Sequence, residues 1–320
     1  MSRSKSRGRR SRTSSRWVAA ALWSTLALAI LGTIWWIANW SEPGEPGTDI
    51  VAKEPTAAST SSPRAAGVAE PEGSEPSLDR PSAPIDEARG PAAPPVGPAR
   101  IAVVIDDLGR SVETVHRLRR IGVPLTYAVL PFESRTPEVV RAINEAGEEM
   151  ILHLPMQARG TQNPGPGALS IDMKPEQVRE LTARALDQTP GAVGVNNHMG
   201  SAFTADADLV AAVMGEVAQR GLIFLDSRTT AETVGAAQAR AAGVPWAERS
   251  VFLDNEKVES AIRDRFLEGL EVAADRGQAI LIGHPYSETL AVLEREVPVA
   301  LSRGFEFVAV SRVVSVPASH

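Results

Sequence analysis

The fold class of this chain is decided by one stretch, residues 101–109, which read IAVVIDDLG. The five leading residues are apolar and mostly β-branched. Such a run is too short for a helix and suits a strand buried on both faces, as in a parallel sheet. Gly109 allows a sharp exit, and Ser111 is a good N-cap for a following helix. The stretch therefore predicts a strand, a turn and a helix, which is the repeating unit of α/β folds.

Two adjacent carboxylates, Asp106 and Asp107, end the predicted strand. Ligands of α/β folds gather at the carboxyl ends of strands, so this pair lies where chemistry is expected. Either aspartate alone could simply cap the next helix. Two side by side favour a functional site, because crowded like charges are costly unless a cation or a proton is shared between them.

Strand-like and helix-like segments alternate seven or eight times along the chain. Apolar runs typical of strands also occupy residues 125–130, 150–154, 193–197, 222–226, 251–254, 279–283 and 305–310. Helical patterns occupy residues 136–146, 174–188, 205–220, 236–242, 258–276 and 286–303. This alternation predicts an α/β fold, an irregular or incompletely closed (β/α) barrel of about seven parallel strands. No Gly-rich phosphate motif follows the first strand, which weakens a nucleotide-binding interpretation.

Three different segments precede this pattern. Residues 1–16 carry seven basic side chains and no acidic one, whereas residues 17–40 carry no charge and place tryptophans near both ends. The uncharged span exceeds the ~20 residues needed to cross a bilayer, so we expect an uncleaved transmembrane signal anchor. Residues 41–99 contain half of the 24 prolines and few large apolar residues, which predicts a disordered linker.

These segments predict where the protein is found. The basic tail should stay in the cytoplasm, which makes the chain a single-pass protein of the inner (cytoplasmic) membrane. The globular domain, residues 100–320, would then lie in the periplasm or, more generally, outside the cytoplasm. The chain contains no cysteine, so neither disulfides nor thiolate ligands are available. Its net charge of −6 includes the seven basic residues of the tail, so the exported part is more acidic still and a nucleic-acid partner is disfavoured.

Three of the five histidines, His153, His198 and His284, lie at predicted strand ends like the two aspartates. A single histidine at a strand end is more often a structural residue, but three on one rim with a carboxylate pair favour a site. One Asp with two His is a common set of ligands for Zn²⁺ or a similar ion in hydrolases, where an open position remains for water.

Other residues at strand ends are weaker candidates. Asn197 precedes His198, and Asp226 and Asp254 end two further predicted strands. Each aspartate could be a helix cap or the partner of an arginine, or it could support a ligand from behind. His116, inside the first predicted helix, and His320, at the terminus, look incidental.

Six short motifs, taken in their order along the chain, resemble those of one protein family. They are IDDLG (105–109), HLPM (153–156), NNHMGS (196–201), FLDS (224–227), VFLDN (251–255) and IGHP (282–285). Together they resemble the divergent polysaccharide deacetylases, the YibQ-like branch of the NodB-type carbohydrate esterases. The likeness covers essentially all of residues 100–316.

The resemblance implies a distorted (β/α) barrel that uses a divalent metal to remove N-acetyl groups from amino sugars. In the family, the first residue of an Asp-Asp pair is the general base and the second is a metal ligand. These roles would fall on Asp106 and Asp107, in that order. Its general acid would fall on His284. Its His-x-x-x-His metal motif would begin at His153, but Gln157 stands where the second histidine is expected. We therefore expect His198 to be the third ligand, which is an inference from geometry.

The sequence thus predicts a metal-dependent hydrolase of the cell envelope that deacetylates an amino-sugar polysaccharide or peptidoglycan. The metal, zinc by preference, would be held by Asp107, His153 and His198. Asp106 would act as base, because consecutive side chains of a strand diverge and one carboxylate can stand beside the ion instead of binding it. Asn197 or a main-chain N–H would help to stabilise the oxyanion. The alternative is an inactive glycan-binding or scaffold module of the envelope.

Overall fold

The computed structural model describes residue 97 and residues 99–316. The predicted basic tail, membrane anchor and nearly all of the predicted linker lie outside the described residues. Within the part that is described, no helix is both long and apolar enough to cross a membrane. The first strand begins at Ala99, one residue before the predicted start of the domain.

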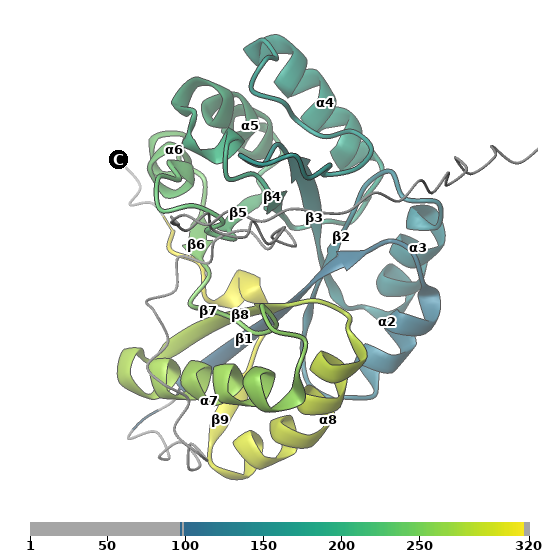
Figure 1. Cartoon of the computed structure of the whole chain (residues 1–320), viewed down its shortest axis with the longest axis vertical. Coiled ribbons are helices and arrows are strands. Elements are labelled where there is room, and N and C mark those ends of the chain that lie inside the picture. The colour runs from purple at the N-terminus through teal and green to yellow at the C-terminus, as the bar shows by residue number, and fades with distance from the viewer. Residues whose placement is uncertain (1–96, 98, 317–320) are drawn as a thin grey trace, which may run out of the picture. The chain divides into compact units, whose positions relative to one another are not determined.

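Nine strands and seven α-helices alternate along the described chain (Figure 1). The strands are β1 (Ala99–Leu108), β2 (Thr126–Val129), β3 (Glu149–Met156), β4 (Gly194–Met199), β5 (Ile223–Asp226), β6 (Trp246–Glu248), β7 (Val251–Phe252), β8 (Gln278–Gly283) and β9 (Phe305–Phe307). The helices are α2 (Val112–Arg119), α3 (Thr136–Ala146), α4 (Pro175–Asp187), α5 (Ala207–Gln219), α6 (Gly235–Ala241), α7 (Glu259–Arg276) and α8 (Ser287–Ser302). The predicted N-cap is confirmed, because the side chain of Ser111 accepts a hydrogen bond from the Thr114 N–H.

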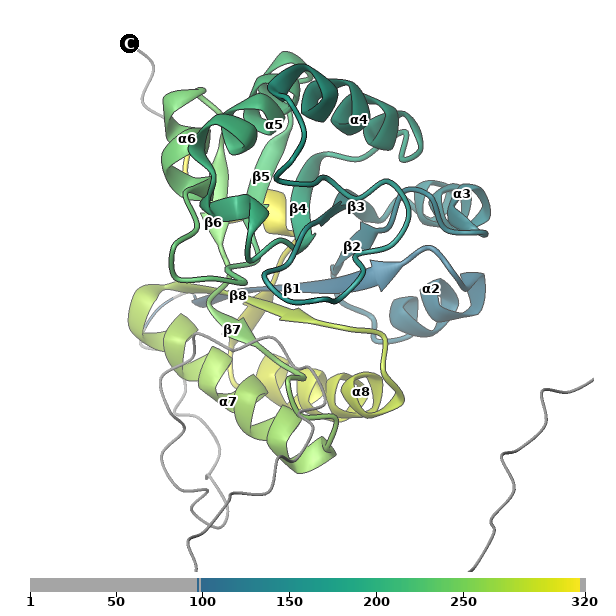
Figure 2. The same cartoon turned by 45° about the horizontal axis from the view of Figure 1, so that its top comes forward.

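All named strands pair in parallel in the order β6-β5-β4-β3-β2-β1-β8-β7, and β9 pairs with the start of β1. The helices lie outside this sheet (Figures 1 and 2). The predicted parallel α/β fold is therefore confirmed. The structure has nine strands, so the predicted count of about seven was too low. None of the predicted apolar runs covers β6, because it has only three residues and contains Trp246 and Glu248.

The two edges of the sheet are consecutive in the chain. Strands β6 and β7 are separated only by Arg249 and Ser250, although they occupy opposite ends of the strand order. The N–H of Arg249 donates to the Asp226 carbonyl beside β6, and the N–H of Ser250 donates to the Ile280 carbonyl beside β7. The three Cα–Cα steps from the end of β6 to the start of β7 span at most about 11 Å, so the sheet must curl until its edges almost meet. The result is a curled, incompletely closed barrel.

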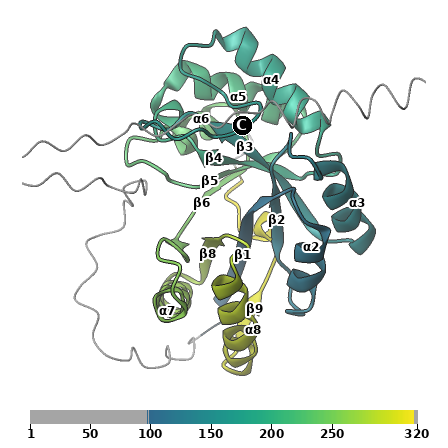
Figure 3. The ribbon, with the colours of Figure 1, turned by 45° about the vertical axis from the view of Figure 1, so that its right-hand side comes forward.

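Alternation along the strands separates the inside of the barrel from its outside. In β1, Ile101, Val103 and Ile105 pack in the large core beneath helices α2, α3, α7 and α8 (Figure 3), whereas Ala102 and Val104 belong to a separate core inside the curl. A second outer core lies beneath helices α4, α5 and α6. The inner core is lined by small and β-branched side chains. Successive residues of each strand therefore face different neighbours.

Residues after β9 fill the end of the curl that lies opposite the strands' carboxyl ends. Val310 and Val313 are buried in the inner core. The Val310 N–H donates to Thr126 Oγ1 at 2.9 Å, and Glu149 accepts hydrogen bonds from Thr126 and Ser311. Since Thr126 and Glu149 lie at the starts of β2 and β3, this end is closed and access is left to the other end.

Two helix-interior glycines give a matched test of packing. A Cβ on Gly269 in α7 would lie 2.7 Å from a methyl carbon of the buried Leu281 on β8, whereas a Cβ on Gly215 in α5 would meet nothing within 4 Å. Crowding costs ~1–3 kcal/mol and outweighs the gain in helix propensity of ~1 kcal/mol. We expect Gly269→Ala to lower the free energy of unfolding by about 1 kcal/mol, and Gly215→Ala to raise it by ~0.4–1 kcal/mol. Urea titration measures both, and equal shifts of one sign would contradict this packing.

Candidate metal centre

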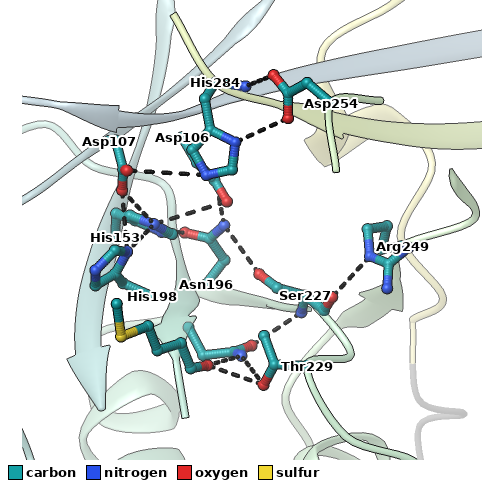
Figure 4. Close-up of polar contacts among 12 residues, drawn as sticks. Asp106, Asp107, His153, Asn196, His198, Ser227, Thr229, Arg249, Asp254 and His284 are labelled. Carbon is teal, nitrogen blue, oxygen red and sulfur yellow. Dashed lines mark hydrogen bonds and ion pairs between the residues drawn. The ribbon is translucent and has the colours of Figure 1, made fainter. Parts of the chain in front are cut away.

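The alternation of the strands decides which polar side chains reach the open end of the curl. In β3, Leu152 and Leu154 pack outside, so His153 points inward. In β4, Val195 packs outside, so Asn196 and His198 point inward. His153 and Asn196 are register neighbours. These three side chains therefore reach the same side of the sheet, and Figure 4 shows them close together.

Asp106 continues the inward series of β1, and an irregularity turns Asp107 in the same direction. Between β1 and β2, Ile105 pairs with Tyr127 and Leu108 pairs with Val129, so β1 contains one extra residue. Asp107 has a positive φ of 58°, which is unusual for a residue with a side chain. Such bulges occur beside active sites, where they redirect a side chain. The expectation that the two carboxylates diverge is wrong, because both reach His153 Nε2, at 3.7 Å from Asp106 and 3.2 Å from Asp107.

Three atoms with lone pairs meet at this point. Asp107 Oδ1 lies 3.0 Å from His198 Nδ1 and 3.2 Å from His153 Nε2, and the two ring nitrogens are 3.0 Å apart. These three residues could hold a metal ion. Among the described residues, Asp107 Oδ1 is buried without a hydrogen-bond partner. A carboxylate oxygen and unprotonated imidazole nitrogens are all acceptors, so the cluster fits a cation.

The charges of the centre depend on burial and on one another. Burial raises the pKa of Asp107, but its contacts with His153 and His198 lower it more, so this pKa lies well below its usual range. Burial lowers the pKa of His153, yet Asp106 and Asp107 raise it overall. Asp107 and His198 are 25% and 14% exposed in their side chains, against 2% for His153. The His284 side chain is 15% exposed, so solvent reaches the centre beside Asp107, His198 and His284.

Asp106 is more deeply enclosed than Asp107. Its residue is 2% exposed, and its Oδ1 accepts a hydrogen bond of 2.9 Å from Asn196 Nδ2. Burial raises the pKa of Asp106, and the nearby His153, His284 and Asn196 oppose that rise only in part. Its second oxygen, Oδ2, faces the centre at 3.7 Å from His153 Nε2.

His284 comes from the end of β8, opposite the two other histidines. Its Nε2 lies 3.8 Å from Asp107 Oδ2, and its Nδ1 lies 2.9 Å from Asp254 Oδ1. Asp254 Oδ2 also accepts hydrogen bonds from the His284 N–H at 2.6 Å and from Thr289 Oγ1 at 2.7 Å. Burial lowers the pKa of His284, but Asp254, Asp107 and Asp106 raise it to about 9. His284 is therefore cationic at neutral pH, and Asp254 supports it from behind.

Asn197 and Asp226 lie outside this cluster because they face the other side of their strands. Asn197 Oδ1 accepts the N–H of Ser227 at 2.9 Å, and its Nδ2 donates to the Met199 carbonyl at 2.8 Å. Both polar atoms thus hold loops together, and no contact places them at the oxyanion position that was expected. Asp226 accepts the N–H of Arg228 and the hydroxyl of Thr233. It organises the loop after β5.

Gln157, the residue in place of the family's second histidine, is also part of a loop. Its Oε1 accepts hydrogen bonds from Ser170 Oγ at 2.8 Å and from the Ile171 N–H at 3.0 Å. Its main chain bonds to Leu169 and Ala202. The side chain therefore has structural contacts of its own, and the second imidazole beside Asp107 is that of His198.

The residue that sequence reasoning missed is Asn196. Its side chain contacts Asp106, His153 and Ser227. The signal was available, since Asn196 lies two positions from His198 and so shares its face of the strand, whereas Asn197 does not.

The buried Asp226 gives a test that depends on pH. Burial raises the pKa of Asp226 above its unfolded value. Its contribution to stability is therefore present at low pH and is lost as pH rises from the ordinary carboxyl range through the raised pKa. Asparagine does not titrate and can still accept from Arg228 and donate to Thr233. We expect Asp226→Asn to become more stable relative to the parent as pH rises through that window. Urea titrations at several pH values measure it, and parallel curves would contradict it.

Comparisons with known proteins agree with this architecture. The profile of the family described as "Divergent polysaccharide deacetylase" matches residues 103–314. The uncharacterized protein YibQ of Escherichia coli is 32% identical over 203 residues, which cover 63% of this chain and 64% of YibQ. The match thus spans less than two thirds of that relative. An uncharacterized protein of Haemophilus influenzae is 31% identical over 196 residues, covering 61% of this chain and 70% of its own length.

A solved structure is also similar over most of the fold. The crystal structure of the uncharacterized protein ATU2773 from Agrobacterium tumefaciens superposes with a TM-score of 0.63 and 26% sequence identity. The match covers 69% of this chain and 93% of that protein. The family profile covers well over half of the chain, from β1 to the residues after β9. This chain therefore belongs to the divergent polysaccharide deacetylase family.

Proposed function

We propose that this protein is a metal-dependent hydrolase that removes N-acetyl groups from an amino-sugar polysaccharide of the cell envelope. One observation carries the proposal: Asp107 Oδ1, His153 Nε2 and His198 Nδ1 converge within 3.2 Å of one another at the accessible end of the curled sheet. Membership of a polysaccharide deacetylase family supports the reaction class.

The three converging residues would hold the divalent ion. Two imidazoles and one carboxylate are typical ligands of catalytic zinc, which keeps a position open for water. When bound, such an ion supplies a Lewis acid for the acetamide carbonyl and lowers the pKa of water toward neutrality. Because Asp107 and His198 are partly exposed, a sugar can approach from their side.

Asp106 and His284 supply the proton transfers. Asp106 Oδ2 faces the centre while its Oδ1 is held by Asn196, so this oxygen is placed to take a proton from the attacking water. His284 is cationic at neutral pH, and its Nε2 lies on the other side of Asp107. It is placed to give a proton to the departing amine, while Asp254 holds its ring from the far side.

The substrate and location follow from the resemblance and from the first 99 residues. Peptidoglycan and other polymers of N-acetylated amino sugars fit the reaction class. The uncharged segment 17–40, flanked by the basic tail, favours an anchor in the cytoplasmic membrane with the domain outside the cytoplasm.

Acetate release from chito-oligosaccharides and from peptidoglycan fragments tests the proposal. The full-length chain is assayed after loading with Zn²⁺, Co²⁺ or Mn²⁺, and again after chelation. We expect acetate only from the loaded chain. A metal-loaded chain that binds these glycans but releases no acetate from any of them would instead establish the glycan-binding module.

A further inference from the structure

Asn196 lies at the centre of the polar network that joins Asp106, His153 and Ser227. It is fully buried in the middle of β4, opposite His153 in register. Its Nδ2 lies 2.9 Å from Asp106 Oδ1 and 3.3 Å from Ser227 Oγ, and its Oδ1 lies 2.8 Å from His153 Nδ1 (Figure 4). One amide thus bridges the proposed base and a proposed metal ligand.

The neighbours of Asn196 determine which way its amide is oriented. The NH₂ group lies 2.9 Å from Asp106 Oδ1, where a carboxyl oxygen accepts its hydrogen bond. The amide oxygen then faces His153 Nδ1, and that nitrogen must carry a proton to make the contact. The opposite orientation would place the amide oxygen against Asp106 Oδ1, with two acceptors in contact.

The protonation of Nδ1 decides what His153 offers to the centre. A neutral imidazole carries one proton, so its lone pair lies on Nε2 when Nδ1 donates. Nε2 is the atom that faces Asp107 and His198. The contact with Asn196 therefore selects the tautomer that can bind a metal and also holds the plane of the ring.

The same amide distinguishes the two oxygens of Asp106. Oδ1 accepts from Asn196, which leaves Oδ2 facing the centre. If the amide were absent, neither oxygen would have a fixed direction, and Oδ1 would lose a buried donor.

We infer that Asn196 is a positioning residue that sets both the tautomer of His153 and the orientation of Asp106. This inference rests on the proposed function, because it concerns the base and a metal ligand of that site. The inference goes beyond the proposed function because one side chain, that of Asn196, contacts both the base Asp106 and the metal ligand His153.

Two substitutions of Asn196 separate its two contacts. Alanine removes both, so Asn196→Ala should bind Zn²⁺ ~10–100-fold more weakly, the usual cost of losing a partner behind a ligand. Aspartate can still accept from His153 Nδ1, but it places a second buried carboxylate beside Asp106 Oδ1, so the two are expected to share a proton and Asp106 is no longer a free base. Asn196→Asp should therefore keep its zinc affinity within about threefold of the parent's, while acetate release falls ~10–100-fold.

The control is Thr182→Val on α4, outside the sheet, which removes a buried hydrogen bond of 2.8 Å to the Val178 carbonyl. It should lower stability without changing zinc affinity. Affinities are measured in the full-length chain by competition with a chromogenic chelator. Parent-like zinc affinity in Asn196→Ala, or equal loss of zinc in both Asn196 variants, would overturn the inference.

A measurement without these variants covers the case in which they do not fold. Nitrogen-15 NMR of the metal-free parent, at a pH where His153 is neutral, should show a slowly exchanging proton on His153 Nδ1, assigned by its loss in His153→Gln. A proton on Nε2 would overturn the inference. If the parent binds zinc but releases no acetate, the proposed function fails and zinc affinity still decides the role of Asn196. If no zinc binds, the role of Asn196 is decided by which nitrogen of the His153 ring carries the proton in the metal-free chain at alkaline pH.

Discussion

His198→Ala is expected to lower the affinity for Zn²⁺ by more than the ~10–100-fold that loss of a supporting partner costs, and to abolish metal-dependent activity with it. His198 Nδ1 is one of three atoms that converge within 3.2 Å, so its removal leaves one carboxylate and one imidazole. Two protein ligands do not make the sites that hold catalytic zinc. Elemental analysis and chelator competition on the purified chain measure the loss.

The matched control is Gln157→Ala, at the position where the family's usual motif has its second histidine. The Gln157 side chain bonds to Ser170 and Ile171 in a loop, so its removal should cost some stability and leave zinc affinity unchanged. This pair tests the relocation of the ligand from residue 157 to residue 198 directly. Loss of zinc in Gln157→Ala with full retention in His198→Ala would refute the proposed set of ligands.

Asp106→Asn is expected to keep the metal and the fold and to lose turnover by ~100-fold or more, the scale of a general base. Asparagine has the same shape but cannot take a proton. The fold should tolerate the change, because Asn196 Nδ2 can donate to the amide oxygen as it does to Asp106 Oδ1. Burial of a neutral side chain is also less costly than burial of a charge.

Acetate release and zinc content of the same preparation decide the role of Asp106. The comparison variant is Asp107→Asn, which should lose zinc because Asp107 supplies the carboxylate oxygen of the cluster. Both carboxylates approach His153 Nε2, but of the two only Asp107 also lies 3.0 Å from His198 Nδ1, so the pair of variants tests which carboxylate is the ligand. Zinc loss in Asp106→Asn with zinc retention in Asp107→Asn would contradict this assignment and make Asp106 the metal ligand and Asp107 the base.

Much of the fold could be predicted from local sequence. Runs such as residues 101–105 and 279–283 are apolar throughout, which indicates strands buried on both faces, and the structure places them side by side as β1 and β8. Strand β6 was missed because three residues with a tryptophan and a glutamate give no periodic signal. Its pairing with β5 is a tertiary contact, which no local pattern contains.

For the candidate site, the sequence by itself determined which strand ends bear the chemistry, because parallel strands bring their carboxyl ends to one rim. Only the tertiary structure decided how some of these side chains meet. Asp107 turns inward through an extra residue in the pairing of β1 with β2, and Asn196 lies beside His153 through the register of β3 with β4. The physical reason is that a bulge and a register are properties of two paired strands, so neither exists in either segment alone.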